Sequence, residues 1–300
     1  GGTVRAAEGT TDLFANNTST GTLQMAVQLG TNGATIDTSL SNARIVRPLD
    51  NMTGQAGTLT KIGANTLTLS GNNTYTGATR VSAGTLLVDT GASIAASASI
   101  VNGGLLRVNG ASGSVTVNSG GSLGGSGTVG AVTLTSGSFL KPGNSPGLLT
   151  ASEATWEAGS TYHWEIDNAA GTPGIHWDVF SVTGALDLSA LSSTAQMNLV
   201  LQSLSLANYS PTTPFSWTIA KAGSFIGTGL ADGANVTDLF NINAAAFNGG
   251  NLPTNGFKVE VGTSGDLRTL NLMAIPEPNT RTLLLAGSLV GMMALRRRRA

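Results

Sequence analysis

The fold is decided by residues 57–89, which read GTLTKIGANTLTLSGNNTYTGATRVSAGTLLVD. In Thr66–Leu69 threonine and leucine alternate, which places both leucines on one face of a strand and both threonines on the other. Asn72, Asn73 and Gly77 are residue types that form turns. The helical spacing of apolar residues is absent, so the stretch predicts short strands joined by tight turns.

A short pattern recurs after this stretch: a β-branched strand, a small polar turn, a glycine and then an apolar residue. Its glycines Gly84, Gly104, Gly121 and Gly137 step by 20, 17 and 16 residues. A repeat of ~16–20 residues is the period of a β-solenoid, whose coils stack ~4.8 Å apart. We therefore expect an all-β fold in which residues 1–150 form a parallel β-helix. A β-sandwich of ordinary hairpins is the alternative.

The stretch 57–89 resembles the autotransporter-associated β-strand repeat. The matching features are Leu59-Thr60-Lys61-x-Gly63, Leu67-Thr68-Leu69-Ser70-Gly71, Asn73-Thr74-Tyr75-Thr76-Gly77, Thr79 and Gly84-Thr85-Leu86. The resemblance implies a right-handed parallel β-helix of the kind found in large surface proteins. In that repeat Lys61, Asn73 and Tyr75 would be structural positions.

Residues 151–274 have a different composition, because they hold both histidines and all 4 tryptophans of the chain. The strands predicted here are Thr161–Asp167, Asp178–Thr183, Met197–Leu201, Phe215–Ala220, Phe257–Val261 and Leu267–Met273. A short helix is predicted around Val236–Phe247. We interpret the region as a β-rich cap or as the terminal coils of the solenoid, since a solenoid needs its last coil covered.

The C-terminal residues 275–300 hold a cluster of basic residues, and the chain before this cluster is acidic. The 15 basic and 16 acidic residues nearly cancel, but four of the basic ones are Arg296, Arg297, Arg298 and Arg299, so the preceding residues carry 11 against 16, a net charge of -5. The uncharged residues 282–295 would span ~21 Å as a helix, short of a ~30 Å hydrocarbon core. We predict a single short C-terminal transmembrane helix with its arginines snorkelling on the cytoplasmic side. A buried helix of a soluble protein is the alternative.

Pro276-Glu277-Pro278 lies immediately before the apolar segment and forms a stiff, extended strip. The order of a Pro-Glu-Pro strip, an apolar segment and an arginine cluster over residues 275–300 resembles the PEP-CTERM protein-sorting signal. The resemblance implies a transient membrane anchor, recognised and removed by an exosortase-type enzyme during export to a bacterial envelope or extracellular matrix. Exopolysaccharide is a further partner that it suggests.

The sequence starts at Gly1-Gly2 and shows no signal peptide ahead of the repeats. An export tail without an export signal is inconsistent, so we expect the chain to be the C-terminal part of a longer precursor.

Composition excludes several kinds of site. There is no cysteine, which removes thiolate metal sites and cysteine nucleophiles, and the net charge of -1 gives no electrostatic footprint for nucleic acid. Gly125–Gly130 fits G-x-G-x-x-G, but a strand rather than a helix is predicted after it, against a dinucleotide site. Gly143–Gly147 fits G-x-S-x-G, but Pro146 lacks the N–H that an oxyanion hole would use. We expect no cofactor.

Five side chains between residues 163 and 178 form the remaining candidate site for a metal ion or a glycan. They are His163, Glu165, Asp167, His176 and Asp178. The first three alternate along a strand and would share one face, and imidazole with carboxylates is a plausible set of ligands for a divalent metal. The alternative is a solvated strand face opposite buried side chains, with Asp178 accepting hydrogen bonds from a turn.

The sequence thus predicts a non-enzymatic, exported β-helical protein of structural or adhesion type at the cell surface. The alternative is a β-helix that binds or cleaves polysaccharide through a site in its Trp/His-rich C-terminal region, since β-helices also host polysaccharide-cleaving enzymes. The repeat region has few carboxylates and few aromatic residues, which favours the first hypothesis.

Overall fold

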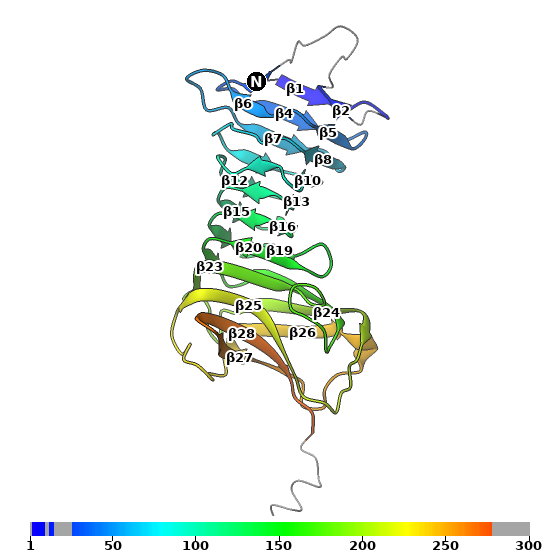
Figure 1. Cartoon of the computed structure of the whole chain (residues 1–300), viewed down its shortest axis with the longest axis vertical. Helices are drawn as coiled ribbons and strands as arrows, with labels where there is room; N and C mark the ends of the chain where they lie inside the picture. Colours follow the sequence, from blue (N-terminus) through cyan, green and yellow to red (C-terminus); the bar gives the residue numbers. More distant parts are fainter. Residues whose placement is uncertain (1, 10–11, 15–25, 278–300) are drawn as a thin grey trace, which may run out of the picture.

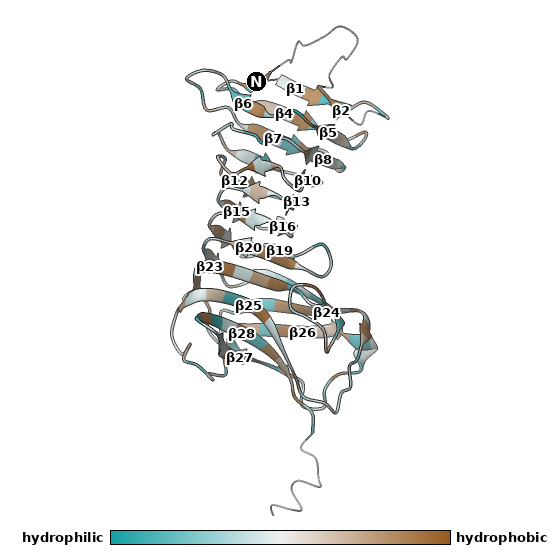
Figure 2. Ribbon diagram, viewed as in Figure 1, coloured by the Kyte–Doolittle hydropathy of each residue, from teal (hydrophilic) through white to brown (hydrophobic). Residues whose placement is uncertain are grey.

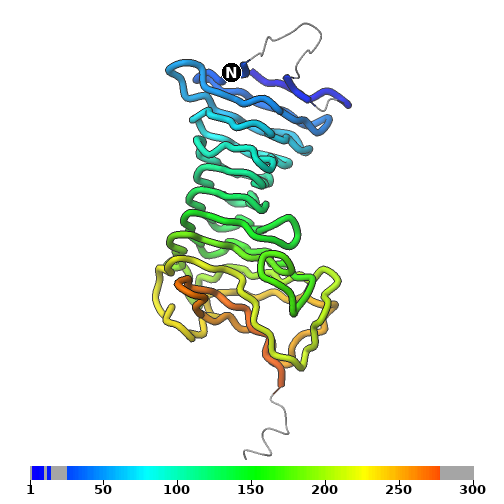
Figure 3. Tube along the Cα trace, viewed as in Figure 1, coloured from blue at the N-terminus to red at the C-terminus, as the bar shows by residue number. Residues whose placement is uncertain are grey.

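The structure is a computed structural model that describes residues 2–9, 12–14 and 26–277. The chain winds into an elongated column of stacked coils with a broader C-terminal end (Figures 1 and 3). Strands of successive coils pair in parallel, as expected for a β-helix, and the β-sandwich of hairpins is therefore wrong for the repeat region. The only helices among the described residues are the short 3-10 turns Thr237–Leu239 (η2) and Asn248–Gly250 (η3).

Each coil contributes strands to three faces of the column. The first face stacks the strands β1 (Gly2–Arg5), β4 (Ala34–Asp37), β7 (Leu59–Ile62), β9 (Thr79–Val81), β12 (Ser99–Val101), β15 (Val115–Val117), β18 (Val132–Leu134) and β21 (Ala154–Trp156). The second face stacks β2 (Asp12–Leu13), β5 (Ala43–Ile45), β8 (Thr66–Leu69), β10 (Thr85–Val88), β13 (Leu105–Val108), β16 (Ser122–Gly125), β19 (Phe139–Pro142), β22 (Thr161–Asn168), β24 (Met197–Ala207) and β26 (Phe240–Ala246).

The third face holds two short stacks. They are β3 (Val27–Leu29) with β6 (Leu49–Asn51), and β11 (Ser93–Ile94), β14 (Ala111–Ser112), β17 (Thr128–Val129) and β20 (Leu148–Ala151). The long strand β23 (Val179–Asp187) pairs with β20 at one end and with β21 at the other, so it joins the third face to the first.

Leucines that stack from coil to coil fill the interior of the second face. The inward register runs through Leu67, Leu86, Leu106, Leu123, Leu140, Tyr162 and Leu199, all fully buried. Apolar and polar residues interleave along the strands (Figure 2), because alternate side chains point inward and outward. Each such burial contributes ~1.5–3 kcal/mol to stability.

Pairing between coils sets the true repeat length. Thr85 pairs with Leu105, Leu105 with Ser122, and Ser122 with Phe139, which gives steps of 20, 17 and 17 residues. The last step differs by one from the glycine spacing of the sequence. The reason is that Gly137 stacks on Gly120, whose N–H donates to the Gly137 carbonyl at 2.9 Å, and not on Gly121.

The C-terminal end changes from parallel to antiparallel pairing. Strand β25 (Phe215–Ile226) pairs in parallel with β23, but β28 (Leu267–Ala274) pairs antiparallel with both β25 and β27 (Phe257–Ser264). An aromatic cluster fills the wider coils here, with Phe215 stacked on Trp217 at 5.2 Å and Phe247 edge-on to Phe257 at 5.1 Å between ring centroids. Large aromatic side chains thus occupy the volume that leucine fills in the narrower coils.

All six strands predicted in residues 151–274 are present, but the helix predicted around Val236–Phe247 is wrong. Most of that segment is strand β26, which pairs in parallel with β24. Within it Phe240 is buried, while Asn241 and Asn243 are exposed, the alternation of a strand. The open edge of β24 therefore outweighs the helical propensity of the alanines.

Candidate functional site

The outward face of β22 carries three of the five candidate side chains. His163, Glu165 and Asp167 alternate along it and are half-buried, as predicted. The inward side chains of the same strand, Tyr162, Trp164 and Ile166, are fully buried. The strand is thus anchored by its apolar side and presents its polar side to the surface.

The five candidates fall into two groups. His163, Glu165 and Asp178 line one hollow. Asp167 and His176 instead contact each other, with 2.9 Å between Oδ1 and Nδ1. Within the described ranges, no three His, Asp or Glu side chains gather closely enough to hold a metal ion.

Asp178 accepts a hydrogen bond from the loop between β19 and β20 and another from β22. Its Oδ1 accepts the N–H of Gly147 at 2.8 Å, and its Oδ2 accepts the N–H of Glu165 at 3.0 Å. Burial raises the pKa of Asp178 to about 8, against the opposing effect of these two backbone donors. The side chain is almost completely buried, so both of its oxygens hold the loop against β22.

The hollow lies on the outward side of the second face and has a volume of about 150 Å³. Arg107 of β13 pairs with Gly124 of β16, and Gly124 pairs with Lys141 of β19. Gly124 is buried and lines the gap between the two exposed cations. Ser145, from the loop, donates its hydroxyl to Glu165 Oε2 at 2.6 Å at the edge of this gap.

His163 completes the hollow. Its ring lies 5.7 Å from that of Phe139 between centroids, and Lys141 Nζ lies 5.8 Å from the Phe139 centroid. Burial lowers the pKa of His163, and the positive charge of Lys141 lowers it further, against the pull of Glu165. The imidazole is therefore biased toward its neutral form.

The tryptophans lie in the core. Trp156 and Trp164 are fully buried, Trp217 is 1% exposed and Trp177 is 6% exposed. Trp164 Nε1 donates to the Asp178 carbonyl at 2.8 Å, and Trp217 Nε1 to the Ala169 carbonyl at 2.9 Å. None of these four rings offers a face on which a sugar could stack at the surface.

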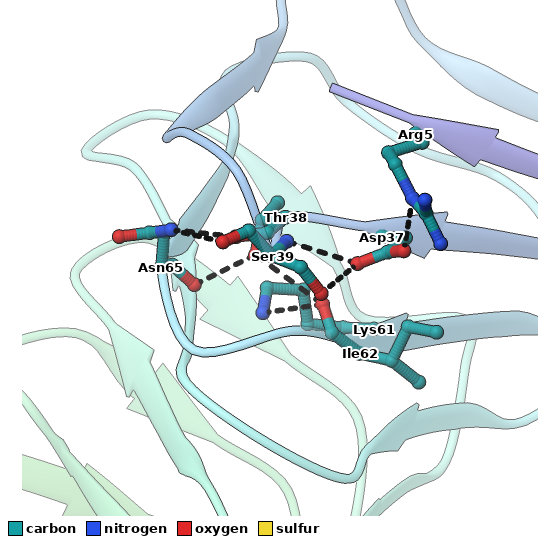
Figure 4. A network of polar contacts seen from close by, with 7 residues as sticks. All are labelled: Arg5, Asp37, Thr38, Ser39, Lys61, Ile62 and Asn65. Atoms are coloured by element: carbon teal, nitrogen blue, oxygen red, sulfur yellow. Dashed lines mark hydrogen bonds and ion pairs between the residues drawn. The ribbon is translucent and has the colours of Figure 1, made fainter. Parts of the chain in front are cut away.

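Lys61 is a buried lysine at a corner of the repeat (Figure 4). Its Nζ donates to the carbonyls of Ile62, Gly63 and Ala83 at 2.7–3.0 Å, so it binds the corner of its own coil to that of the next coil. Burial lowers the pKa of Lys61 to about 8, while the carboxylate of Asp37 acts in the opposite direction.

Asp37 is the acidic partner in this network (Figure 4). Its carboxylate accepts the Ser39 hydroxyl, the Arg5 Nε–H at 2.7 Å and the Ser39 N–H at 2.9 Å. These hydrogen bonds, those from Ser39 and Arg5 first, lower the pKa of Asp37 to about 2. The cluster holds three adjacent coils together and leaves Lys61 no contact with solvent.

Asn73 and Tyr75 have equally structural contacts. Asn73 accepts the N–H of Leu49 at 2.9 Å and donates to the carbonyls of Gly71 and Ser93, which links it to the coils on either side. The Tyr75 hydroxyl lies 2.6 Å from Thr79 Oγ1 within the core. Together with Lys61, these residues satisfy buried backbone and hydroxyl groups where the chain turns.

The Pro-Glu-Pro strip at residues 276–278, called the sorting strip below, follows the end of β28. Ile275 donates its N–H to the Gly256 carbonyl at 3.0 Å, and Asn255 Nδ2 donates to the Pro276 carbonyl at 3.0 Å. Pro276 is half-buried and Glu277 is exposed. Pro278, the predicted membrane segment 282–295 and Arg296–Arg299 lie outside the described residues. Within the described part of the chain, no helix has the length and apolar character to cross a membrane.

Sequence reasoning missed Arg107, Lys141 and Ser145, which line the hollow beside His163 and Glu165. The signal was present in the repeat length. A step of 17 residues from Arg107 reaches Gly124, and a second step reaches Lys141. The repeat length therefore places Arg107, Gly124 and Lys141 in one column across adjacent strands.

Two family models match parts of the chain. Residues 59–88 match the passenger-associated-transport-repeat, and residues 274–299 match the PEP-CTERM protein-sorting motif. Both resemblances inferred from the sequence are therefore confirmed. A search of curated proteins gives no match. The sorting motif implies export, association with a bacterial membrane or cell envelope, and processing by an exosortase.

Proposed function

We propose that this chain is a non-enzymatic structural or adhesion-type protein of the bacterial surface or extracellular matrix. Its tail would hold it in the membrane, with the arginines on the cytoplasmic side, until an exosortase removes it. The observation that carries the proposal is the order along the chain: a stacked β-helix is followed directly by the sorting strip, which begins where β28 ends.

The contacts inside the repeat support a structural role. The polar side chains of the repeat signature are buried and bonded to the backbone of adjacent coils, as described for Lys61 and Asn73. Residues used in this way stabilise an extended surface and take no part in chemistry on a substrate. Stacked coils also let a protein reach far from the membrane with only a small core in each coil.

The loop around Ser145 supports a non-enzymatic role for the one motif that resembles a nucleophile site. Pro146 has no N–H, and the next N–H, that of Gly147, is already donated to Asp178. Strand β20 begins at Leu148, where a nucleophile elbow would require a helix. The backbone donors that an oxyanion would need are therefore absent or occupied.

Replacing Pro276, Glu277 and Pro278 with alanine tests the proposal in cells. We expect the variant to remain in the membrane fraction with its tail attached, whereas the unchanged chain reaches the surface and becomes accessible to antibody on intact cells. A matched control replaces Thr212, Thr213 and Pro214 with alanine, since these three exposed residues precede β25 at the same end of the molecule but lie outside the strip. Equal surface delivery of the alanine variant would contradict the proposal.

A further inference from the structure

A column of outward positions on the second face carries two exposed cations, Arg107 and Lys141. It runs from Arg107 through Gly124 to Lys141, and His163 follows on the next strand. Neighbouring strands lie ~4.8 Å apart, so the Cα atoms of Arg107 and Lys141 are separated by about 10 Å. The slot is the part of the hollow between these two cations, and the buried Gly124 lines it.

The acceptors around this slot are mostly in use. Both Asp178 oxygens hold backbone N–H groups, and Glu165 Oε2 accepts the Ser145 hydroxyl. By contrast, Arg107 and Lys141 form no ion pair and no side-chain hydrogen bond with any residue in the described ranges. The slot therefore offers unsatisfied charged donors, which suit a carboxylate, phosphate or sulfate.

An apolar column lies beside the cations. Leu105 and Phe139 are the half-buried outward residues of β13 and β19, two positions before Arg107 and Lys141. Leu105 pairs with Ser122, and Ser122 pairs with Phe139, so the apolar side chains flank a small polar one. A surface with cations on one side and a low apolar ridge on the other matches a sugar ring that has an apolar C–H face and an anionic substituent.

We propose that this slot binds an acidic glycan, with Arg107 and Lys141 holding carboxylates of neighbouring uronic acid units and with Leu105 under a sugar ring. The acidic groups that face the slot are Glu165 at its rim and the buried Asp178, whose oxygens are committed to the loop. The inference deepens the adhesion-type role and rests on it, since a surface protein would meet such a polymer in the matrix.

Calorimetric titration of the full chain, kept in solution with a nonionic detergent, tests the inference with a hexamer of galacturonic acid as the probe. We expect binding that weakens as salt is raised and that falls at least tenfold in the double variant Arg107→Gln/Lys141→Gln. The matched control is Arg80→Gln, which removes an equally exposed arginine from the first face and leaves binding unchanged. A neutral glucose hexamer should not bind.

Several outcomes would overturn the inference. They are no binding of the galacturonic acid hexamer, an equal loss in Arg80→Gln, or stronger and variant-sensitive binding of inorganic phosphate or of vesicles with anionic headgroups. Circular dichroism of each variant checks that the strands are intact, which is expected because all three side chains are exposed. Surface delivery and tail removal are measured separately, so failure of glycan binding would leave the proposed function standing.

Discussion

Single residues in this chain show how a fold with few charges uses its buried polar groups. Lys61, Asp37 and Asn73 lie almost out of contact with solvent, yet each binds backbone or side-chain groups of adjacent coils. A buried polar group without a partner costs ~1–3 kcal/mol, so these contacts fix one register between coils. The same logic applies to Asp178, which the sequence predicts either as a ligand or as a hydrogen-bond acceptor for a turn, and which accepts the N–H groups of Gly147 and Glu165.

The first prediction concerns Lys61. Replacing it with methionine keeps the length of the side chain but leaves the three corner carbonyls without their donor, so we expect a loss of about 2 kcal/mol or more in the free energy of unfolding. Arg80→Met is the control, because Arg80 is exposed on the neighbouring coil and should change stability little. The measurement is urea unfolding, and equal midpoints for the two variants would contradict the structural role.

The second prediction concerns pH. The folded chain keeps Asp178 protonated up to about pH 8, because burial raises its pKa to about 8, whereas the unfolded chain releases that proton in the ordinary carboxyl range. Folding therefore takes up a proton at pH values between the pKa of Asp178 in the unfolded chain and its pKa in the folded chain. The contribution of Asp178 to stability is consequently largest at low pH and is lost as pH rises toward 8.

Thermal unfolding of Asp178→Asn from pH 5 to pH 8 measures this contribution. We expect the variant to be less stable overall, because it loses one backbone hydrogen bond, and to show a smaller decline with rising pH than the unchanged chain. Asp266→Asn, at an exposed turn, should keep the unchanged slope. Parallel curves for Asp178→Asn and the unchanged chain would disprove the protonated state.

At the scale of elements, the period of the solenoid was readable from the sequence because the corners at Gly84, Gly104, Gly121 and Gly137 leave no room for a Cβ, which would lie 2.4–2.6 Å from the preceding coil. Gly84 has φ +63°, and a Cβ there would lie 2.4 Å from the Gly63 carbonyl oxygen of the preceding coil. Alternation of leucine and threonine indicated the strands, since one face of each strand is buried. The one-residue error in the last repeat step and the wrongly predicted helix at 236–247 have the same cause. Pairing with the strand of the adjacent coil sets both the register and the β conformation, and a local sequence pattern does not show which strands pair.

The third prediction separates strain from contact at these corners. Gly91 has φ +78°, and no atom lies within 4 Å of the position that a Cβ would take there, so alanine at Gly91 brings backbone strain alone. Alanine at Gly84 brings the same strain and a collision with the coil beneath it. We expect Gly91→Ala to cost ~1 kcal/mol and Gly84→Ala clearly more, measured by urea unfolding. Equal costs would show that the coils are not stacked in this register.

At the scale of the whole molecule, sequence reasoning recovered the stack of parallel strands and the sorting motif. It did not recover the slot between Arg107 and Lys141, because residues in separate coils come together only through the register. The four tryptophans of the Trp/His-rich region are core side chains of the wide coils. Along the chain, a column of stacked coils is thus followed by a wider end with antiparallel strands and by the strip that leaves that end at Pro276.

The intact mass of the protein recovered from the bacterial envelope or matrix tests the central claim most directly. An exported β-helix processed at its sorting motif should end near Pro276–Pro278, so its mass should lack the apolar segment 282–295 and Arg296–Arg299. Surface material that still carries the four arginines would contradict processing at this motif.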